Sequence, residues 1–245
     1  MKITVLTLFP QMVSPFFSSS IMKRAVEKHI IDYEIVNFRT YSTGAYNKVD
    51  DLPYGGGAGM LLMPEPLEKA IKAHKGDNAR VIYPSASGRL FNQAMAYELS
   101  RESELLFICG HYEGLDKRII DEYVDDEISI GDYVLTSGET SSIVIIDALF
   151  RLIDGVISSE SLEDESFSSS LLEYDQYTRP ERYCNSSVPD VLLSGNHALI
   201  CSWRDQNRLA KTMRSRPDML SEASLSLGMR RKLIKVIEEF GIEDL

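Results

Sequence analysis

The feature that most constrains the fold is a regular alternation of strand-like and helix-like segments that runs to about Asp154. Short segments whose apolar residues alternate or run without a break predict strands, and apolar residues three or four positions apart predict helices. Such alternation is typical of an α/β domain with a mostly parallel sheet. The predicted strands are Ile3–Phe9, Ile35–Tyr41, Ala79–Tyr83, Leu105–Cys109 and a weaker, glycine-interrupted Glu127–Leu135. The predicted helices are Ser20–His29, Pro64–Lys75, Gln93–Arg101, Leu115–Val124 and Thr140–Ile153.

The end of this alternation predicts a change of domain. Ile157–Ser170 is rich in serine and acidic residues and has few apolar ones. Such a segment buries too little apolar surface to offset the entropy of ordering it. We therefore expect an α/β domain over residues 1–156, a flexible acidic linker over 157–172 and a small all-helical domain over 173–245.

The C-terminal part shows only helical periodicity. A short helix over Pro189–Ser194 is predicted to close at Gly195, because glycine is favoured just after a helix end. Asn196 is a good N-cap for the next helix, which is expected to reach about Arg214. A last helix is predicted over Gly228–Phe240.

Charge is distributed unevenly along the chain. The whole sequence has 26 Lys and Arg against 37 Asp and Glu, a net charge of −11, which argues against a nucleic-acid-binding protein. Between Cys201 and Lys235, however, nine basic residues face three acidic ones, a local excess of +6. Between Leu152 and Thr178 there is no Lys or Arg. The basic cluster is either a solvated helix face or a surface that binds phosphates, since phosphate contacts depend on nearby charge.

Several classes of protein are excluded by simple patterns. The longest aliphatic stretch, Ile143–Ile146, ends at Asp147, far short of the roughly 20 apolar residues that span a bilayer. The N-terminal apolar run alternates like a strand and is broken at Pro10, which is unlike a signal peptide. The three cysteines and four histidines show no spacing typical of disulfide frameworks or zinc sites. We expect a soluble cytoplasmic protein with no membrane partner and no structural metal.

One glycine-rich stretch, Gly55–Met60, invites comparison with nucleotide-binding loops. Its spacing puts Met60 where a dinucleotide fingerprint needs a third glycine, and it lacks the lysine of a phosphate-binding loop. The four glycines instead allow positive φ angles and the close approach of another group. From composition alone, an ordinary flexible loop is favoured.

Three further loops follow predicted strands and are candidates for one ligand pocket. They are Ser85–Gly88, Cys109–Gly114 and Ile130–Glu139. Ligands bind at the carboxyl ends of strands in open α/β sheets, and glycines there expose bare backbone. His111 could act as a base, but a structural role is favoured for a single histidine in a loop. Cys109 is interpreted as a small buried hydrophobic residue, because no cation is adjacent in sequence.

The order of motifs along the chain is more specific than any one of them. The motifs are Leu8–Pro10, Val49–Met60, Cys109–Gly114, Ile130–Leu135, Tyr177–Pro180, Val191–His197 and Trp203–Arg204. Taken together, they closely resemble the bacterial tRNA (guanine-N1)-methyltransferases, which methylate the guanosine at tRNA position 37. The resemblance is collinear and spans almost the whole chain.

This resemblance implies properties that periodicity cannot give. It implies a SPOUT-type parallel sheet with a deep C-terminal trefoil knot, a homodimer whose active sites use both chains, and tRNA with guanosine at position 37 as the partner. It also implies S-adenosylmethionine as the methyl donor and the possible use of Mg²⁺. The residues implied to bind the donor are Tyr83, Ser85, Gly110, Glu113, Ile130, Gly131, Asp132, Tyr133, Val134, Leu135 and Gly138.

The resemblance also implies which side chains perform the chemistry. Arg151 corresponds to the catalytic arginine, and a carboxylate directly before Ser166 to the general base. The family has Asp there, whereas this chain has Glu165 preceded by Asp164. Glu165 is favoured because its extra methylene extends its reach, and Asp164 is the alternative.

The two donor loops also depart from the family pattern. Ser85-Ala86-Ser87-Gly88 replaces Ser-Pro-Gln-Gly, and Ser137-Gly138-Glu139-Thr140-Ser141 replaces Gly-Gly-Glu-Leu-Pro. Loss of proline and glycine changes backbone freedom in these loops. Besides the active enzyme, a catalytically weakened homologue that binds tRNA and S-adenosylmethionine is therefore a second hypothesis. A redox or phosphate-binding α/β protein is a third, disfavoured by the failed glycine fingerprints.

Overall fold

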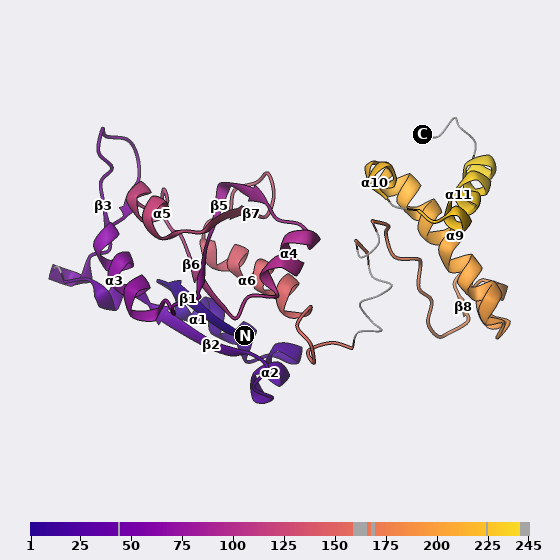
Figure 1. Ribbon diagram of the computed structural model, residues 1–245, viewed down its shortest axis with the longest axis horizontal. Helices are drawn as coiled ribbons and strands as arrows, with labels where there is room; N and C mark the ends of the chain where they lie inside the picture. Colours follow the sequence, from indigo (N-terminus) through magenta and orange to yellow (C-terminus); the bar gives the residue numbers. More distant parts are fainter. Residues whose placement is uncertain (44, 159–165, 168–169, 224, 241–245) are drawn as a thin grey trace. The chain divides into compact units, whose positions relative to one another are not determined.

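The protein forms two compact units, Met1–Ser158 and Ser159–Leu245. The computed structural model describes residues 1–43, 45–158, 166–167, 170–223 and 225–240. The predicted linker over 157–172 therefore lies largely outside the described residues. Each unit is described by itself below (Figure 1).

The first unit is built on a parallel sheet. The strands of this sheet are β1 (Lys2–Thr7), β2 (Asp32–Asn37), β5 (Arg80–Leu90), β6 (Glu104–Ile108) and β7 (Asp126–Ser129). Their order is β2-β1-β6-β5-β7, and every neighbouring pair is parallel. The expected α/β class with a parallel sheet is confirmed.

Helices join the strands and cover both faces of the sheet (Figure 1). They are α1 (Pro10–Phe17), α2 (Ser20–Glu27), α3 (Pro64–His74), α4 (Gln93–Leu99), α5 (Lys117–Tyr123) and α6 (Gly138–Phe150). Between β2 and α3 lie two short 3₁₀ helices, η1 (Phe38–Tyr41) and η2 (Ala45–Asn47), and a small antiparallel pair, β3 (Asp50–Asp51) and β4 (Leu61–Leu62).

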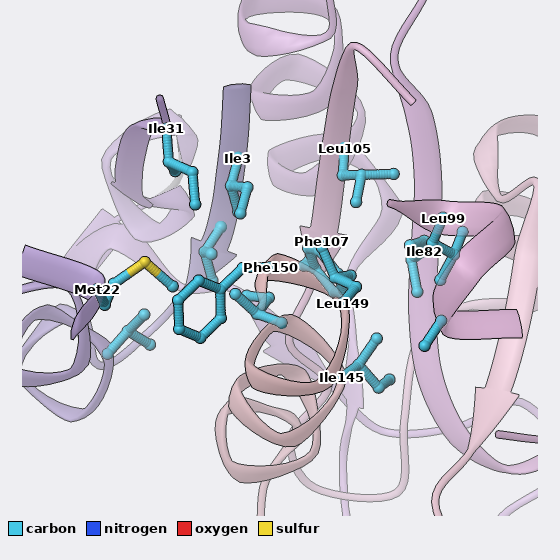
Figure 2. Packing of buried hydrophobic residues seen from close by; sticks show 14 of the residues in the cluster. Ile3, Met22, Ile31, Ile82, Leu99, Leu105, Phe107, Ile145, Leu149 and Phe150 are labelled. Atoms are coloured by element: carbon cyan, nitrogen blue, oxygen red, sulfur yellow. The ribbon is translucent and has the colours of Figure 1, made fainter. Parts of the chain in front are cut away.

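The core has two halves, one on each face of the sheet. Successive side chains of a strand point to opposite faces, so along β6 Leu105 and Phe107 join one cluster while Leu106 and Ile108 join the other. The first cluster packs under α1, α2, α4 and α6, and Figure 2 shows Phe107 beside Leu149 and Phe150 of α6. The second packs under α3 and α5. Burial on both faces explains why the strands read as nearly continuous apolar runs.

The strand β5 differs from its prediction in a way that shapes the site. We expected it to end at Tyr83, but it continues to Leu90. Pro84 and Arg89 both lie opposite Ile128 of β7, so residues 85–88 bulge out between them. The predicted turn after a strand end is thus a bulge inside one long strand, which resumes because Arg89 and Leu90 pair with β7 again.

Other boundaries also differ from the predictions. The helix α1 was not predicted, because Pro10 was interpreted as a break, whereas proline is well tolerated at the first position of a helix. Residues 38–41, expected to continue a strand, form η1. The predicted strand Glu127–Leu135 ends at Ser129, and Gly131 follows with a φ of 150°.

The second unit is mostly helical. It contains α8 (Asp190–Leu193), α9 (His197–Ser215), α10 (Pro217–Glu222) and α11 (Leu227–Phe240). The Asn196 side chain caps α9 by accepting hydrogen bonds from the amides of Ala198 and Leu199, as predicted. The expectation of an all-helical domain is wrong in one respect, because β8 (Arg182–Tyr183) and β9 (Ser186–Ser187) form a small hairpin.

A small core holds the second unit together. Leu171, which we had placed in the linker, is buried with Leu209 and Met213 of α9 and Val236 of α11. The backbone amide of Leu172 also donates a hydrogen bond to Thr212 Oγ1 at 2.9 Å. Residues around 171 therefore belong to the helical unit. Across the described residues, no helix is long and apolar enough to cross a membrane.

Candidate functional site

One cleft lies beside the β5 bulge and the carboxyl ends of β6 and β7. Its volume is about 410 Å³, and it is lined by residues 83–87, 110–114, 128–131, 133–138 and 141. The three loops that the sequence singled out thus contribute to a single cavity. A cavity of this size is within the range of small-molecule sites, which are usually lined by apolar groups and a few convergent polar ones.

Ten of the eleven residues implied to bind the methyl donor line this cleft. Asp132 is the exception, since its side chain is exposed and does not line the cavity. The next three residues, Tyr133, Val134 and Leu135, line the cleft and are 56%, 90% and 40% exposed. The cleft thus offers an exposed apolar rim next to glycine backbone.

The loop after β7 is shaped by two glycines. Gly131 has a φ of 150°, and a side chain there would collide with the ring of Tyr133, which folds back so that its hydroxyl donates to the Ile130 carbonyl at 3.3 Å. At the other end, the Gly138 amide donates to the Gly110 carbonyl at 2.8 Å. A Cβ on Gly138 would lie 2.5 Å from the Gly110 nitrogen. The two loops therefore touch through bare backbone.

Tyr83 forms part of the cleft wall. It is buried, and burial together with the charge of Glu127 raises the pKa of its phenol to about 12. The phenol therefore stays neutral at physiological pH. A Cβ on Gly110 would lie 2.9 Å from the Tyr83 ring, so the glycine lets the ring pack against the loop.

A buried carboxylate supports the cleft from behind. Glu139, in the first turn of α6, is fully buried and accepts hydrogen bonds from Thr7 Oγ1 of β1 and from His111 Nε2, the latter at 2.8 Å. Burial alone would raise its pKa, but the hydrogen bonds from His111 and Thr7 hold it below the ordinary value. Glu139 therefore joins β1, the loop after β6 and the start of α6.

This arrangement bears on two sequence interpretations. His111 is tied to Glu139 and lies 4.9 Å, ring centre to ring centre, from Phe9, which supports its structural interpretation. Cys109 is fully buried, as expected, and burial, with the charge of Glu139 added, raises the pKa of its thiol. Neither side chain has the setting of an activated nucleophile.

The glycine-rich loop reaches the same site. Gly55, Gly56, Gly57 and Gly59 all have positive φ angles, as their composition suggested. The first three have open space around them, whereas a Cβ on Gly59 would collide with the Glu113 side chain. The Glu113 amide also donates to the Met60 carbonyl at 3.0 Å. The loop is therefore docked on a residue that lines the cleft.

The implied catalytic arginine does not line the cleft. Arg151 directly follows α6, at the opposite end of that helix from the cleft-lining Gly138. The 13 residues of α6 span about 20 Å at 1.5 Å per residue, which separates Arg151 from the cleft of its own chain. Glu165 and Asp164 lie outside the described residues.

Only some of the basic side chains between Cys201 and Lys235 are available to form a binding surface, because others make contacts within the helical unit. Arg208 is 8% exposed, and its Nε donates to the Leu172 carbonyl at 3.3 Å. Arg204 packs its guanidinium over Tyr174 at 4.7 Å from the ring centre, and Lys211 pairs with Asp175 at 2.8 Å. Part of the positive charge that the sequence places in this stretch is therefore paired or buried within the helical unit.

Sequence reasoning missed the side chains that support the cleft. Glu139, Thr7 and the Glu127 carboxylate, described below, were not singled out. A carboxylate in a first turn usually signals only a favourable interaction with the helix dipole. The one available signal for Glu139 was its position directly after Gly138 and before an apolar helix. This position is compatible with burial but does not require it.

Comparison with known proteins fits this geometry. A sequence model described as tRNA (Guanine-1)-methyltransferase TrmD matches residues 1–222. The chain belongs to this family. Proteins named tRNA (guanine-N(1)-)-methyltransferase are 53% identical over 240 residues in Treponema denticola, 51% over 243 in Treponema pallidum and 49% over 248 in Dehalococcoides mccartyi. The alignments cover 98% and 99%, 99% and 97%, and 100% and 100% of this chain and of the relative, respectively.

The family membership confirms the resemblance that the motifs suggested. The protein is an enzyme of the tRNA (guanine-N1)-methyltransferase family, which fits an α/β unit with a cleft at one sheet edge. The two segments that depart from the family pattern contribute residues 85–87, 137, 138 and 141 to the lining of that cleft. These departures do not affect the assignment to the family, but they change residues that shape the cleft.

Proposed function

We propose that the protein transfers a methyl group from S-adenosylmethionine to N1 of the guanosine at position 37 of tRNA. One observation carries this proposal: three sequence segments that the family resemblance assigns to the methyl donor line a single cleft of about 410 Å³. The relatives' names, which specify tRNA and guanine N1, support the substrate.

The proposed chemistry is a direct methyl transfer. A carboxylate, Glu165 or alternatively Asp164, takes the N1 proton; the N1–methyl bond forms as the sulfur–methyl bond breaks and leaves a thioether. The Arg151 guanidinium stabilises the negative charge that grows on guanine O6. The cleft supplies alignment, because the methyl carbon must lie in line with N1.

The position of Arg151 supports a homodimer with shared active sites. Within one chain, the length of α6 separates this residue from the cleft. If both act on one guanine, Arg151 reaches the cleft of a second chain. We therefore propose a twofold dimer, and with it the trefoil knot that the resemblance implies.

A divalent metal is not assigned to residues of this chain. Among the described residues, no three His, Cys, Asp or Glu side chains are grouped so as to hold a metal ion. The use of Mg²⁺ that the resemblance implies stays a prediction. The helical unit is proposed to bind tRNA through exposed cations, which predicts an affinity that falls steeply with salt.

The decisive experiment is transfer of a labelled methyl group to a tRNA transcript with guanosine at position 37, alongside calorimetry with S-adenosylmethionine. Glu165→Gln is expected to lose most turnover while donor binding persists, and Asp164→Asn serves as its control. Loss in Asp164→Asn alone would make Asp164 the base. Donor binding without any transfer by the wild-type protein would favour the weakened homologue, and the same assay with a position-37 adenosine transcript tests the base specificity.

A further inference from the structure

The bulge in β5 is tied down by one carboxylate. Ser85 Oγ and Ser87 Oγ each donate a hydrogen bond of 2.5 Å to the same oxygen, Oε1 of Glu127. The two hydroxyl oxygens lie 2.9 Å apart, and the Ser87 amide donates to Ser85 Oγ at 3.1 Å. We call Ser85, Ser87 and Glu127 the serine–carboxylate clamp.

The bulge needs such a clamp because its residues do not pair with the neighbouring strand. Residues 85–88 have no pairing partner in β7, since Pro84 and Arg89 both pair with Ile128. A Cβ on Gly88 would collide with the backbone of Glu127 and Ile128, so the bulge is pressed closely against β7. With few backbone bonds, its shape depends on side-chain hydrogen bonds, and those made to a charged carboxylate are the strong ones.

The clamped residues form a wall of the cleft. Ser85, Ala86 and Ser87 line the cavity, whereas Glu127 does not and lies behind them. The carboxylate is therefore placed to act on a ligand through the two serines rather than by touching it. The loop has alanine and serine where the family resemblance expects proline and glutamine, respectively, so another source of rigidity is required here.

We propose that Glu127 is a positioning residue for the methyl donor, holding the 85–88 bulge in its binding shape through Ser85 and Ser87. This inference rests on the proposed function, because it assigns the adjoining cleft to S-adenosylmethionine. A bulge held in place before binding avoids the cost of ordering it when the ligand arrives. Loss of the clamp should therefore weaken donor binding more than it slows the chemical step.

A second role for the carboxylate, direct attraction of the positive donor, makes a different prediction. S-adenosylmethionine carries a sulfonium charge, whereas S-adenosylhomocysteine has a neutral thioether in the same skeleton. If Glu127 positions the loop, its loss weakens both ligands by a similar factor. If it acts by long-range attraction, the charged ligand is weakened selectively.

The test is calorimetry with both ligands on full-length variants. Glu127→Ala is expected to raise both dissociation constants about tenfold, and Glu127→Gln about threefold, because an amide oxygen still accepts but the bonds lose charge assistance. Ser87→Ala should weaken binding in the wild-type background and have no further effect in Glu127→Ala. Glu122→Ala, which removes an exposed carboxylate of α5, is the charge-matched control and should bind as wild type.

Two further readouts separate positioning from general damage. In steady-state kinetics, Glu127→Ala should raise the donor KM about tenfold with kcat within about twofold of wild type. In the ligand-free protein, hydrogen exchange should speed up at the Ser87 amide, with no change at the sheet strands β1 and β6.

The outcomes distinguish the inference from the proposed function. Wild-type binding of both ligands together with unchanged affinity in Glu127→Ala would overturn the clamp alone. Selective loss of S-adenosylmethionine would overturn positioning in favour of attraction. A wild-type protein that binds neither ligand and transfers no methyl group would overturn the proposed function and the donor assignment with it.

Discussion

The carboxylate of Glu139 and Nε2 of His111 lie 2.8 Å apart, with Glu139 completely buried at the start of α6. This pair fixes the loop after β6 against the helix that follows the loop after β7. This side-chain hydrogen bond joins two walls of the cleft, in addition to the backbone hydrogen bond between Gly138 and Gly110. A buried carboxylate of this kind contributes stability only while it is ionised.

The first prediction concerns pH. Because the hydrogen bonds hold the pKa of Glu139 below its ordinary value of 4.5, its contribution to stability is complete above about pH 4.5 and is lost as the pH falls through the folded-state pKa. Glu139→Gln should lower the unfolding free energy by about 1–3 kcal/mol at pH 7. Urea unfolding at pH 7 and pH 4 measures both proteins, and the gap should shrink in acid. An equal gap at both pH values would contradict this.

The second prediction separates two glycines of one loop. Gly59→Ala and Gly55→Ala carry the same backbone strain, since their φ values are 88° and 86°. Only the added Cβ at position 59 would collide with the Glu113 side chain. We expect both variants to lose about 1–2 kcal/mol of stability, but only Gly59→Ala to weaken donor binding by calorimetry. Similar binding by the two variants would show that docking of this loop on Glu113 does not matter.

The third prediction concerns the backbone contact between two walls. A Cβ on Gly138 would lie 2.5 Å from the Gly110 nitrogen and 2.9 Å from the Cys109 Cα, which are main-chain atoms that cannot swing aside. Gly138→Ala should therefore cost about 1–3 kcal/mol of stability and reduce donor binding. Gly228→Ala in α11, where the nearest atom is a Ser226 side chain 3.9 Å away, is the control. Thermal unfolding should show no loss there, since alanine favours a helix.

The fourth prediction tests whether active sites are shared between chains. Arg151→Ala removes the arginine, and Leu135→Arg places a bulky cation at the exposed rim of the cleft. Each variant alone should be inactive. After subunit exchange, half of the dimers are mixed and each has one intact site, so about a quarter of wild-type activity should return.

The result of mixing is read in the methyl-transfer assay at constant total protein. A mixture that stays inactive, while gel filtration and mass spectrometry show mixed dimers, would place Arg151 and the cleft of one chain in the same site. It would also contradict the separation along α6.

The fifth prediction sorts the cations of the helical unit. Arg208→Ala should destabilise the protein by about 1–3 kcal/mol, because Arg208 is buried and bonded to the Leu172 carbonyl. Arg231 of α11 is exposed, so Arg231→Ala should leave unfolding unchanged. If α11 contacts tRNA, that variant also lowers the slope of log affinity against log salt by about one. An unchanged slope would exclude Arg231 as a phosphate contact.

The sequence by itself determined the class of fold and the place of the site. Strands buried on both faces must be largely apolar, and helices over them must be amphipathic. Apolar strands such as Leu105–Cys109, separated along the chain by amphipathic helices, were therefore enough to predict a parallel sheet. Glycines at 110, 131 and 138 marked the loops because ligand contact and backbone contact both require them. The Asn196 cap could be recognised because capping is a local interaction.

Only the tertiary structure decided which side chains hold these loops together. The strand β5 continues beyond its bulge because Pro84 and Arg89 both pair with Ile128 of β7. No local sequence pattern predicts this pairing. Glu139 tolerates burial because Thr7 and His111, distant in sequence, donate hydrogen bonds to its carboxylate. Arg208 looks like its basic neighbours in sequence, but folding turns it inward. Burial and pairing are properties of neighbours in space, and residues 28 to 132 positions apart become neighbours only when the chain folds.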